Sequence, residues 1–575
     1  MRFELIGLGM RYERRRPRGI EPVQGVLLFL TLMAIALITV WSQMPPAPKD
    51  VVGPDEFSAT RALADIEAIT AGGPHPTGSE AQAQVREYLI QRLESIGYSP
   101  QVCSEWITQT DWNEDILVKN IVAMLDGQQA GPAVMITAHY DSVHTGPGAM
   151  DDGAGVAVLL QIAESLANRT VRNPVIFLLS DGEEYNVLGA KAFVAYSPLA
   201  EDVAVVLNLE SRGSSGLGLL FEMGEGNREL IKLYADAVDR PAASSAFYAL
   251  YEQLPVWTDF TVYKQVGMTG YNIANIGTPE TYHTAADSAE NVNLGTLQHI
   301  GDTAMALALR LADADLESLR ASEDSIFFDI FTRTLIHYPQ KHAIPLAILA
   351  LAISLLAWAR LGSIQPDKPG VDLIVGSAAF VISTIAAFLC GLAAIRLVSP
   401  VLPVIPESGI VVQHPAASVA ILSAAAVGAT AALAALERWS GIAGLVGGAL
   451  IWWNAAVVAS TILLPGVSYL FVFPTIVCAL GLLALSFMDP ASAWTHLIAM
   501  LPGIVVASIL WMPYAGLLTL TGGTLMFLPI IPVVLLASLA GPLFAGLRGS
   551  IRWVPVVSCL VVSAVAVVVT HWLMV

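Results

Sequence analysis

Residues 133–155 read AVMITAHYDSVHTGPGAMDDGAG. The mostly apolar run 133–138 predicts a buried β-strand, and His139 and Asp141 stand where this strand would end. A Gly-Pro-Gly turn then leads to Asp151 and to a stretch at 156–168 whose apolar spacing predicts a helix. A buried strand, a polar loop and a helix in this order are typical of an α/β fold with a parallel sheet.

The same alternation continues through residues 50–320. Apolar runs predict strands at 116–125, 175–179, 204–209 and 270–276, and amphipathic stretches predict helices at 59–71, 79–96, 228–238 and 294–311. This region therefore predicts an α/β three-layer sandwich with a mostly parallel central sheet. Functional sites in such sheets form just past the carboxyl ends of the strands.

The composition predicts that much of the chain lies in a bilayer. Of its 575 residues 55% are hydrophobic and only 13% are charged, and the mean hydropathy is +0.62. The apolar run 23–43 is about as long as a transmembrane helix, with a cleaved signal peptide as the alternative. Region 343–575 is almost continuously apolar and predicts an all-α polytopic transmembrane domain of about eight helices. Within it, 515–546 is expected to be one tilted helix or a broken pair.

Arginines near the N-terminus predict which way the chain crosses the membrane. Residues 1–22 contain Arg2, Arg11, Arg14, Arg15, Arg16 and Arg18. Cytoplasmic segments beside membrane helices carry an excess of Lys and Arg, so this N-terminus should be cytoplasmic. The domain at 50–320 is then expected on the opposite face, which is the periplasm or exterior of a bacterium, or the lumen of an organelle in a eukaryote.

The charge balance and the cysteines exclude two kinds of function. The chain has 48 Asp and Glu against 29 Lys and Arg, a formal net charge of −19, and the acidic residues concentrate between the membrane regions. Such a surface repels phosphates, so no nucleic-acid partner is expected. Cys103 is the only cysteine within 50–320, which leaves no disulfide framework and no zinc site made of cysteines.

Histidines and carboxylates follow four of the predicted strands. They are His139 and Asp141 after the first strand, Glu183 and Glu184 after 175–179, Glu210 after 204–209, and His283 after 270–276. Two histidines with several carboxylates suit Zn²⁺, which binds imidazole nitrogen and carboxylate oxygen. Two metal ions can share a bridging carboxylate and a water of raised acidity. The adjacent pair Glu183 and Glu184 then allows one carboxylate to bind metal while the other acts as general base.

Four segments carry a resemblance to a known family. They are AHYDSVHTGPGAMDDGAG (138–155), SDGEEYNVLGAKAF (180–193), VVLNLESRG (205–213) and TYHTAADS (281–288). In this order they resemble the co-catalytic two-zinc aminopeptidases, family twenty-eight of the metallopeptidases, over about residues 55–312. Glu210 stands where many soluble members have Asp, which resembles the membrane-bound branch, the endoplasmic-reticulum metallopeptidase and vacuolar membrane protease type. That branch also places one helix before the peptidase domain and about eight after it.

The resemblance implies two zinc ions per chain. By it, His139 and Glu210 would hold one ion, Glu184 and His283 would hold the other, and Asp151 would bridge the two. The fold and activity that it implies are those of a zinc peptidase.

Three further residues receive roles through the same resemblance. Glu183 would be the general base that activates the shared water and later passes the proton to the leaving amine. Asp141 would orient His139, as acceptors behind ligating histidines commonly do. Tyr282 would donate a hydrogen bond to the tetrahedral oxyanion.

Other polar residues near these motifs have simpler explanations. Asp152 would support the turn that carries Asp151, Asp181 and Asp287 would cap helices or accept hydrogen bonds behind the ligands, and His75, His144 and His299 would be surface or packing residues.

The leading hypothesis is a membrane-anchored, zinc-dependent exopeptidase, an aminopeptidase, whose partners are peptide substrates and the lipid bilayer. One alternative is a glutaminyl-cyclase-like transferase, which shares this fold and uses one zinc ion. Another is a noncatalytic membrane protein that only binds peptides, which would have no use for a base at Glu183. The preference for amino or carboxyl termini, the side-chain specificity and the oligomeric state stay open.

Overall fold

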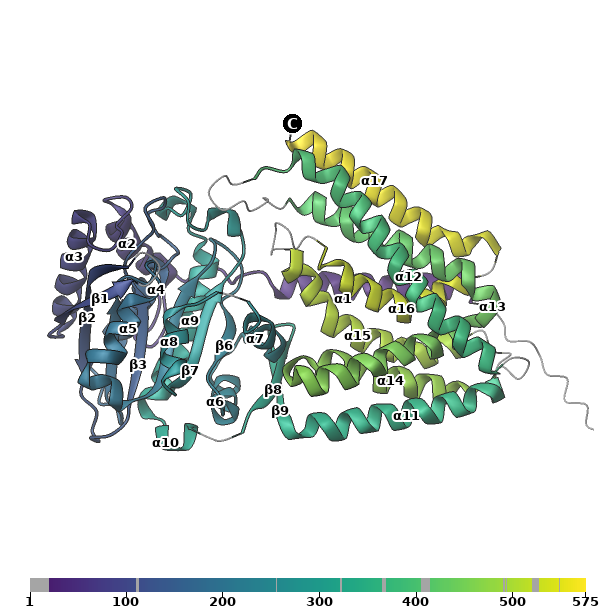
Figure 1. Cartoon of the computed structure of the whole chain (residues 1–575), viewed down its shortest axis with the longest axis horizontal. Coiled ribbons are helices and arrows are strands. Elements are labelled where there is room, and N and C mark those ends of the chain that lie inside the picture. Colours follow the sequence, from purple (N-terminus) through teal and green to yellow (C-terminus); the bar gives the residue numbers. More distant parts are fainter. Residues whose placement is uncertain are drawn as a thin grey trace, which may run out of the picture.

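The computed structural model describes residues 20–109, 113–254, 256–320, 323–364, 369–404, 414–489, 492, 494–519, 527–547 and 549–574. The arginines on which the expected orientation depends lie outside these residues. The chain forms an α/β half and a helical half, joined side by side (Figure 1).

A seven-stranded sheet in the order β1-β2-β4-β3-β5-β7-β6 forms the centre of the α/β half. Its strands are β1 (Gln101–Gln109), β2 (Glu114–Leu125), β3 (Ala133–His139), β4 (Val175–Ser180), β5 (Val203–Ser211), β6 (Leu219–Met223) and β7 (Thr269–Asn275). The four strands β4, β3, β5 and β7 are parallel, whereas β1, β2 and β6 pair antiparallel at the edges. Parallel strands therefore make up the part of the sheet in which the candidate site residues lie.

Helices cover both faces of this sheet. They are α2 (Ala59–Thr70), α3 (Glu80–Ile96), α4 (Gly153–Leu166), α5 (Leu188–Tyr196), α6 (Arg228–Ala237), α7 (Ser245–Tyr251), α8 (Asp259–Gln265), α9 (Leu294–Asp313) and α10 (Leu316–Leu319). Along β3, Val134 and Ile136 pack in the core with α2, α3, α4 and α9, while Met135 packs on the other face with α5 and α8. Both faces are thus buried, which explains why β3 is mostly apolar rather than alternating. The predicted three-layer α/β sandwich is confirmed.

Several elements escaped the sequence analysis. The edge strand β1 alternates between exposed and half-buried residues, and its Trp106 is 65% exposed, so it lacks the apolar run of a buried strand. The hairpin of β8 (Ser325–Ile330) and β9 (Thr334–Pro339) forms a separate two-stranded sheet. In Figure 1 this hairpin lies between the two halves of the molecule.

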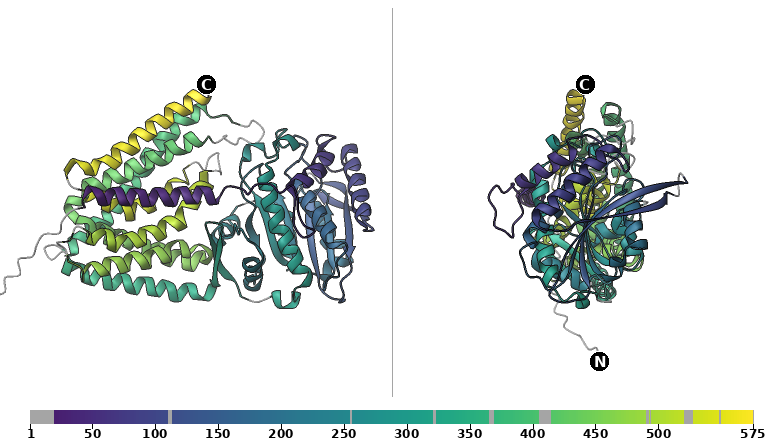
Figure 2. Two further views of the ribbon diagram at one scale, coloured as in Figure 1. Left: turned by 180° about the vertical axis from the view of Figure 1, so that it is seen from behind. Right: turned by 90° about the vertical axis from the view of Figure 1, so that its left-hand side faces the viewer.

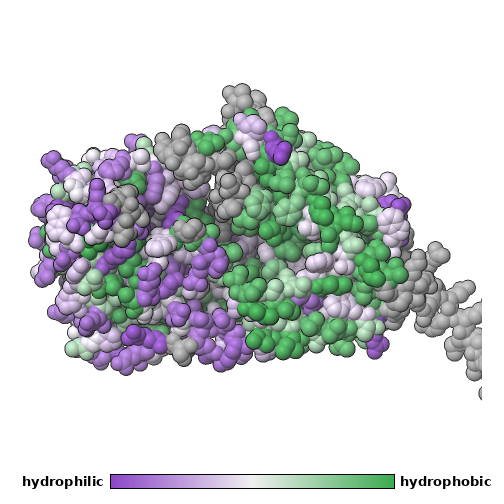
Figure 3. All heavy atoms as spheres, viewed as in Figure 1, coloured by the Kyte–Doolittle hydropathy of each residue, from purple (hydrophilic) through white to green (hydrophobic). Residues whose placement is uncertain are grey.

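The helical half gathers α1 with the C-terminal helices, and Figure 2 shows α1 running among them. The helices are α1 (Pro22–Ser42), α11 (Ala343–Ile364), α12 (Pro369–Val398), α13 (Pro415–Leu463), α14 (Tyr469–Leu485), α15 (Thr495–Thr519), α16 (Ile530–Ala545) and α17 (Val554–Met574). Within the described residues, six helices are long and apolar enough to cross a membrane. Their outward surface is hydrophobic where that of the α/β half is hydrophilic (Figure 3). The prediction of an integral membrane protein is confirmed.

Two details of the helical half differ from simple spans. The long helix α13 is two helices joined at Gly441, whose φ of 67° interrupts the helical backbone. The segment 515–546 is not one helix, because α15 continues to Thr519 and α16 begins at Ile530. With α13 counted as two, the described part of 343–575 holds eight helical segments, and the number that cross the bilayer stays a prediction.

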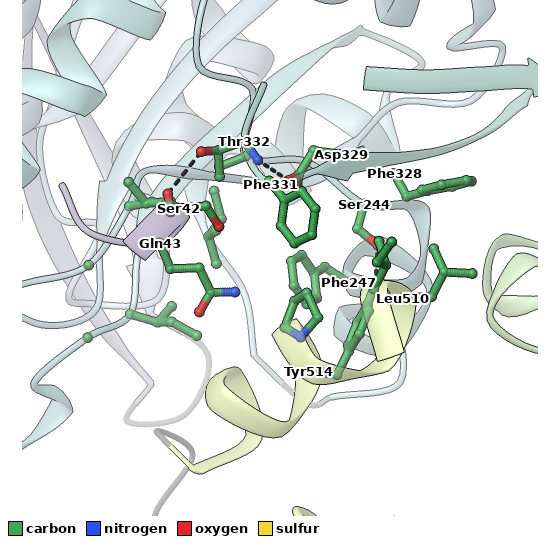
Figure 4. Close-up of a pocket in the computed structure, with 18 of the residues that line it drawn as sticks. Ser42, Gln43, Ser244, Phe247, Phe328, Asp329, Phe331, Thr332, Leu510 and Tyr514 are labelled. Carbon is green, nitrogen blue, oxygen red and sulfur yellow. Dashed lines mark hydrogen bonds between the residues drawn. The ribbon is translucent and has the colours of Figure 1, made fainter. Parts of the chain in front are cut away.

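Polar side chains join the two halves beside a small cavity. Ser244 at the start of α7 shares its hydroxyl with Tyr469 of α14 (2.8 Å) and with Tyr514 of α15, and the ring of Phe328 in β8 stacks on Tyr469 at 4.2 Å. A cavity of about 110 Å³ lies next to these residues, between the end of α1, the hairpin and α15 (Figure 4). The hairpin is tied to α1 there, since the Thr332 hydroxyl donates to the Ser42 carbonyl oxygen at 2.9 Å.

We expect Tyr514→Phe to lower the thermal midpoint of the detergent-solubilised chain. The substitution keeps the ring but removes a buried hydroxyl that bonds to Ser244 and Tyr469, and an unsatisfied buried polar group costs about 1–3 kcal/mol. Thermal unfolding followed by tryptophan fluorescence measures the shift. Ser318→Ala, which removes an exposed hydroxyl, is the control. Equal midpoints for both variants would show that the hydrogen bonds among Ser244, Tyr469 and Tyr514 do not stabilise the protein.

Candidate metal centre

The strand ends bring the five expected ligands to one edge of the sheet. His139 ends β3, Glu184 follows β4, Glu210 lies in β5, His283 follows β7, and Asp151 lies in the loop before α4. Because β4, β3, β5 and β7 are parallel, their carboxyl ends meet at this edge. Two groups result, His139 with Asp151 and Glu210, and Asp151 with Glu184 and His283, and within each the ligand atoms lie within 4.8 Å of one another.

Asp151 belongs to both groups. Its Oδ1 lies 3.3 Å from Nε2 of His139, and its Oδ2 lies 3.2 Å from Nε2 of His283. Nε2 of His139 is also 3.9 Å from Oε2 of Glu210, and Nε2 of His283 is 3.1 Å from Oε2 of Glu184. A carboxylate whose two oxygens face two separate histidines has the arrangement that a bridging ligand requires.

The backbone around Asp151 is held by two other acids. Asp287 accepts hydrogen bonds from the backbone N–H groups of Met150 (2.8 Å) and Asp151 (3.2 Å). Asp152 caps α4, where its Oδ1 accepts from the N–H of Gly155 at 3.0 Å. The peptide bond between Asp151 and Asp152 is cis. Asp152 thus supports the turn as expected, and Asp287 is an acceptor behind the site rather than a helix cap.

Asp141 holds both the first histidine and the glutamate pair. Nδ1 of His139 lies 3.0 Å from the backbone oxygen of Asp141 and 3.5 Å from its Oδ1. The carboxylate of Asp141 also accepts from the N–H groups of Glu183 (3.1 Å) and Glu184 (3.2 Å). When Nδ1 carries the hydrogen, the lone pair of Nε2 faces Asp151 and Glu210. The sequence suggested only the contact with His139.

The polar atoms at this centre are suited to bind a divalent cation, because some of them are buried without a hydrogen-bond partner. Among the described residues, Nε2 of His283 and Oε1 of Glu184 are buried without a hydrogen-bond partner. Buried polar atoms are rarely left so, because each costs free energy unless something satisfies it. The donors are imidazole nitrogens and carboxylate oxygens, which are ligands of Zn²⁺. His139, Glu183 and Glu184 form a third group within 4.8 Å, so Glu183 reaches the same centre.

Burial and crowding shift the pKa values of these groups strongly. Burial raises the pKa of Glu210 to about 8, and burial together with the neighbouring Glu210 raises the pKa of Glu183 well above its usual range. Burial acts to lower the pKa of His283, but Asp151 and Glu184 raise it to about 10. Burial also raises the pKa of Asp287 to about 7. The folded chain therefore holds protons at neutral pH that a bound cation would displace.

We expect the chelator-treated protein to be less stable at pH 8 than at pH 6. The pKa of Glu210 rises from 4.5 to about 8 on folding and that of Asp287 from 3.8 to about 7, so the folded chain binds more protons than the unfolded chain between these values. Stability contributed by a raised pKa is lost as the pH rises through the folded value. The thermal midpoint should fall from pH 6 to pH 8, zinc at pH 8 should restore it, and Glu210→Gln should weaken the dependence. A midpoint that rises over this range in the metal-free protein would contradict the expectation.

Tyr282 lies beside the second histidine. Its ring stacks on that of His283 with centroids 3.7 Å apart, and the guanidinium carbon of Arg212 lies 5.7 Å from the centroid of the Tyr282 ring. Burial raises the pKa of Tyr282 well above its usual range, so its hydroxyl keeps its hydrogen and stays a donor. The oxyanion role suggested for Tyr282 stays a prediction.

The sequence analysis missed Asp259. This residue begins α8, is buried, and accepts a hydrogen bond from the Ser180 hydroxyl at the end of β4. Burial raises the pKa of Asp259 to about 6. The negative charge of Asp259 in turn acts to raise the pKa of both Glu183 and Glu210, after the larger effect of their burial. Its only local signal is the start of a helix, so a link to the centre could not be found without the fold.

The remaining polar residues take supporting places. Asp181 accepts from the backbone N–H of Lys119 (2.7 Å) and from the Thr77 hydroxyl (2.9 Å), so it is an acceptor and not a helix cap. His299 is buried between the Gly218 N–H and the Arg240 carbonyl oxygen, as a packing residue. His75 is also buried, and His144 contacts the Tyr185 hydroxyl at 2.8 Å.

Fold and site together define a class, an α/β domain with a candidate metal centre, carried by a membrane protein. Residues 120–308 match the family model described as Peptidase family M28. A domain of this family implies zinc at the centre. The resemblance inferred from the four motifs is thereby confirmed.

The chain has distant relatives among curated membrane peptidases. It is 29% identical over 312 residues to endoplasmic reticulum metallopeptidase 1 of Rattus norvegicus, covering 50% of this chain and 34% of that protein. It is 29% identical over 385 residues to a vacuolar membrane protease of Phaeosphaeria nodorum, covering 58% of this chain and 39% of that protein. The matched region thus spans little more than a third of these relatives.

Solved structures also align with part of the chain. An aminopeptidase from Aneurinibacillus sp. strain AM-1 has a TM-score of 0.38 and 15% identity, covering 45% of this chain and 95% of its own. A glutaminyl cyclase of Porphyromonas gingivalis has a TM-score of 0.37 and 21% identity, covering 44% of this chain and 98% of its own.

Proposed function

We propose that this protein is a membrane-anchored exopeptidase, an aminopeptidase that holds two zinc ions and hydrolyses the N-terminal bond of peptides. The observation that carries the proposal is the pair of ligand groups sharing Asp151, with the carboxylate of Glu183 at the same centre. A centre that only bound peptides would have no use for a base at this place. A one-zinc transferase would not need both groups.

The proposed roles divide the site into ligands and acting residues. His139 and Glu210 would hold one ion, Glu184 and His283 the other, and Asp151 would bridge them. When bound, zinc would supply a water of lowered pKa and polarise the scissile carbonyl.

Two of the chain's own groups would then act on the substrate, and a third would hold the site in position. Glu183 would take the proton of the attacking water and deliver it to the leaving amine. Tyr282 would donate to the developing oxyanion, and Asp141 would keep His139 and the glutamate pair in position.

A metal-restoration assay tests the proposal. The full chain in detergent is stripped with a strong chelator, reloaded with zinc and offered a panel of dipeptides and aminoacyl anilides. We expect the stripped protein to release no amino acid, and we expect release of the N-terminal amino acid to return only after two zinc ions per chain have been bound. No hydrolysis of any substrate would overturn the proposal. Hydrolysis restored by one ion would contradict the two-zinc centre, and cyclisation of an N-terminal glutamine without hydrolysis would favour the transferase instead.

We also propose that the α/β half faces away from the cytoplasm. The support is the arginine-rich segment 1–22 that precedes α1. Labelling of the α/β half with a membrane-impermeant reagent, in intact cells and in cells whose membrane has been permeabilised, tests this orientation. Labelling that requires opening the cytoplasmic side would contradict it.

A further inference from the structure

Arg212 is a cation at the candidate centre that the proposed mechanism does not use. It lies near the end of β5, two residues beyond Glu210. Its N–H donates to the carbonyl oxygen of Asn275 at 2.8 Å, and the preceding Ser211 hydroxyl bonds to the Asn275 side chain at 2.9 Å. Gly213 then packs against the backbone of Gly277 with no room for a β-carbon. The backbone that carries Arg212 is therefore fixed relative to Glu210.

The guanidinium of Arg212 has donors to spare. Its one hydrogen bond among the described residues is a long one, 3.5 Å from Nη2 to the carbonyl oxygen of Trp257. Among the described residues no carboxylate lies within 4.0 Å of the Arg212 guanidinium, whereas Arg92 and Arg228 each form an ion pair with a carboxylate. Arg212 is only partly buried, so a ligand can reach it.

Arg212 lies close to residues of the candidate centre. Its guanidinium carbon is 5.7 Å from the centroid of the Tyr282 ring, and Arg212 follows Glu210 by two residues. A guanidinium presents five N–H donors in a planar fork that matches a carboxylate. Charge-assisted bonds of this kind are about twice as strong as neutral ones.

We propose that Arg212 binds the α-carboxylate of the residue released from the C-terminal side of the cut bond, so that the preferred substrates are dipeptides. This inference rests on the proposed function, because it assigns a substrate class to the same site. In a dipeptide the free carboxylate belongs to the residue whose amine leaves, so it lies next to the scissile bond. In a longer peptide an uncharged amide occupies that place and leaves the guanidinium without a partner.

The test compares a dipeptide with its carboxamide. The zinc-loaded full chain is given leucyl-alanine and leucyl-alanine carboxamide, and the ratio of their kcat/KM values is measured. We expect the wild type to prefer the free acid, Arg212→Gln to lower the ratio about 10- to 100-fold, and Arg212→Lys to recover part of it. Equal losses on both substrates would overturn the inference and indicate an effect on the oxyanion or on folding.

A matched control and a second substrate sharpen the result. Arg240→Gln removes a guanidinium of the same domain that bonds to the Ser42 and Met44 carbonyl oxygens, so it should leave the ratio unchanged. Leucyl-aspartate carboxamide carries only a side-chain carboxylate. If Arg212→Gln affected this substrate as strongly as leucyl-alanine, the α-carboxylate assignment would be wrong.

Binding without turnover separates this inference from the proposed function. In zinc-loaded Glu183→Gln protein, calorimetry should give a lower Kd for leucyl-alanine than for its carboxamide, and adding Arg212→Gln should remove that difference. Equal Kd values in the Glu183→Gln protein would overturn the inference even if the wild type hydrolyses both. Failure of the wild type to hydrolyse either substrate would overturn the proposed function, while the difference in Kd would still support carboxylate binding.

Discussion

Glu183→Gln is expected to lower kcat by about 10²–10⁴-fold while zinc content stays near that of the wild type. The amide has nearly the same shape as the carboxylate but cannot accept the proton of the attacking water. The ligand groups around Asp151 are complete without Glu183, so the metal should remain. Hydrolysis of dipeptides and elemental analysis of the same purified sample provide the two measurements.

The control for this prediction is Glu290→Gln, which makes the same change at an exposed residue outside the centre. Its kcat should match that of the wild type. Because Glu183 also lies within 4.8 Å of His139 and Glu184, the zinc content decides between base and ligand. A Glu183→Gln protein that had lost its zinc would assign Glu183 as a ligand and leave the base unidentified.

Asp151→Asn should have the second large effect, the loss of zinc together with activity. The two oxygens of Asp151 face His139 at 3.3 Å and His283 at 3.2 Å, so one substitution affects both groups. An amide offers one neutral oxygen where two cations need a shared negative charge. We expect fewer than one tightly bound zinc ion per chain and kcat/KM lowered at least about 10³-fold.

The neighbouring Asp152→Asn is the matched control. Asp152 caps α4 through an oxygen that accepts from Gly155, and asparagine retains such an oxygen. This variant should keep its zinc and most of its activity, with only a small change in thermal midpoint. If Asp151→Asn kept two zinc ions, the proposed bridge would be wrong. If both variants lost metal equally, the loop before α4 rather than the Asp151 carboxylate would be responsible.

The central strands and the residues that follow them could be predicted because their signals are local. β3 and β5 are buried on both faces and are therefore continuous apolar runs, and a polar residue at the end of such a run is conspicuous. His139 and Glu184 were found in this way, and His283 by the short strand before its loop. The parallel arrangement then placed them together without knowledge of any contact.

What the sequence did not reveal depends on contacts between distant segments. Asp259 takes its place only because α8 packs against α5, β5 and β7, and its hydrogen-bond partner Ser180 lies 79 residues earlier in the chain. The hydrogen bond between Ser244 and Tyr469 joins residues that are 225 positions apart in the chain. It connects two halves that the sequence presents as separate domains. The spare donors of Arg212 are likewise visible only once its neighbours are in place.

Zinc anomalous scattering from crystals of the full chain would locate the metal ions themselves. We expect two zinc peaks per chain, one beside His139 and Glu210 and one beside Glu184 and His283, with Asp151 between them. A single peak, no peak after saturation with zinc, or peaks away from these five side chains would contradict it.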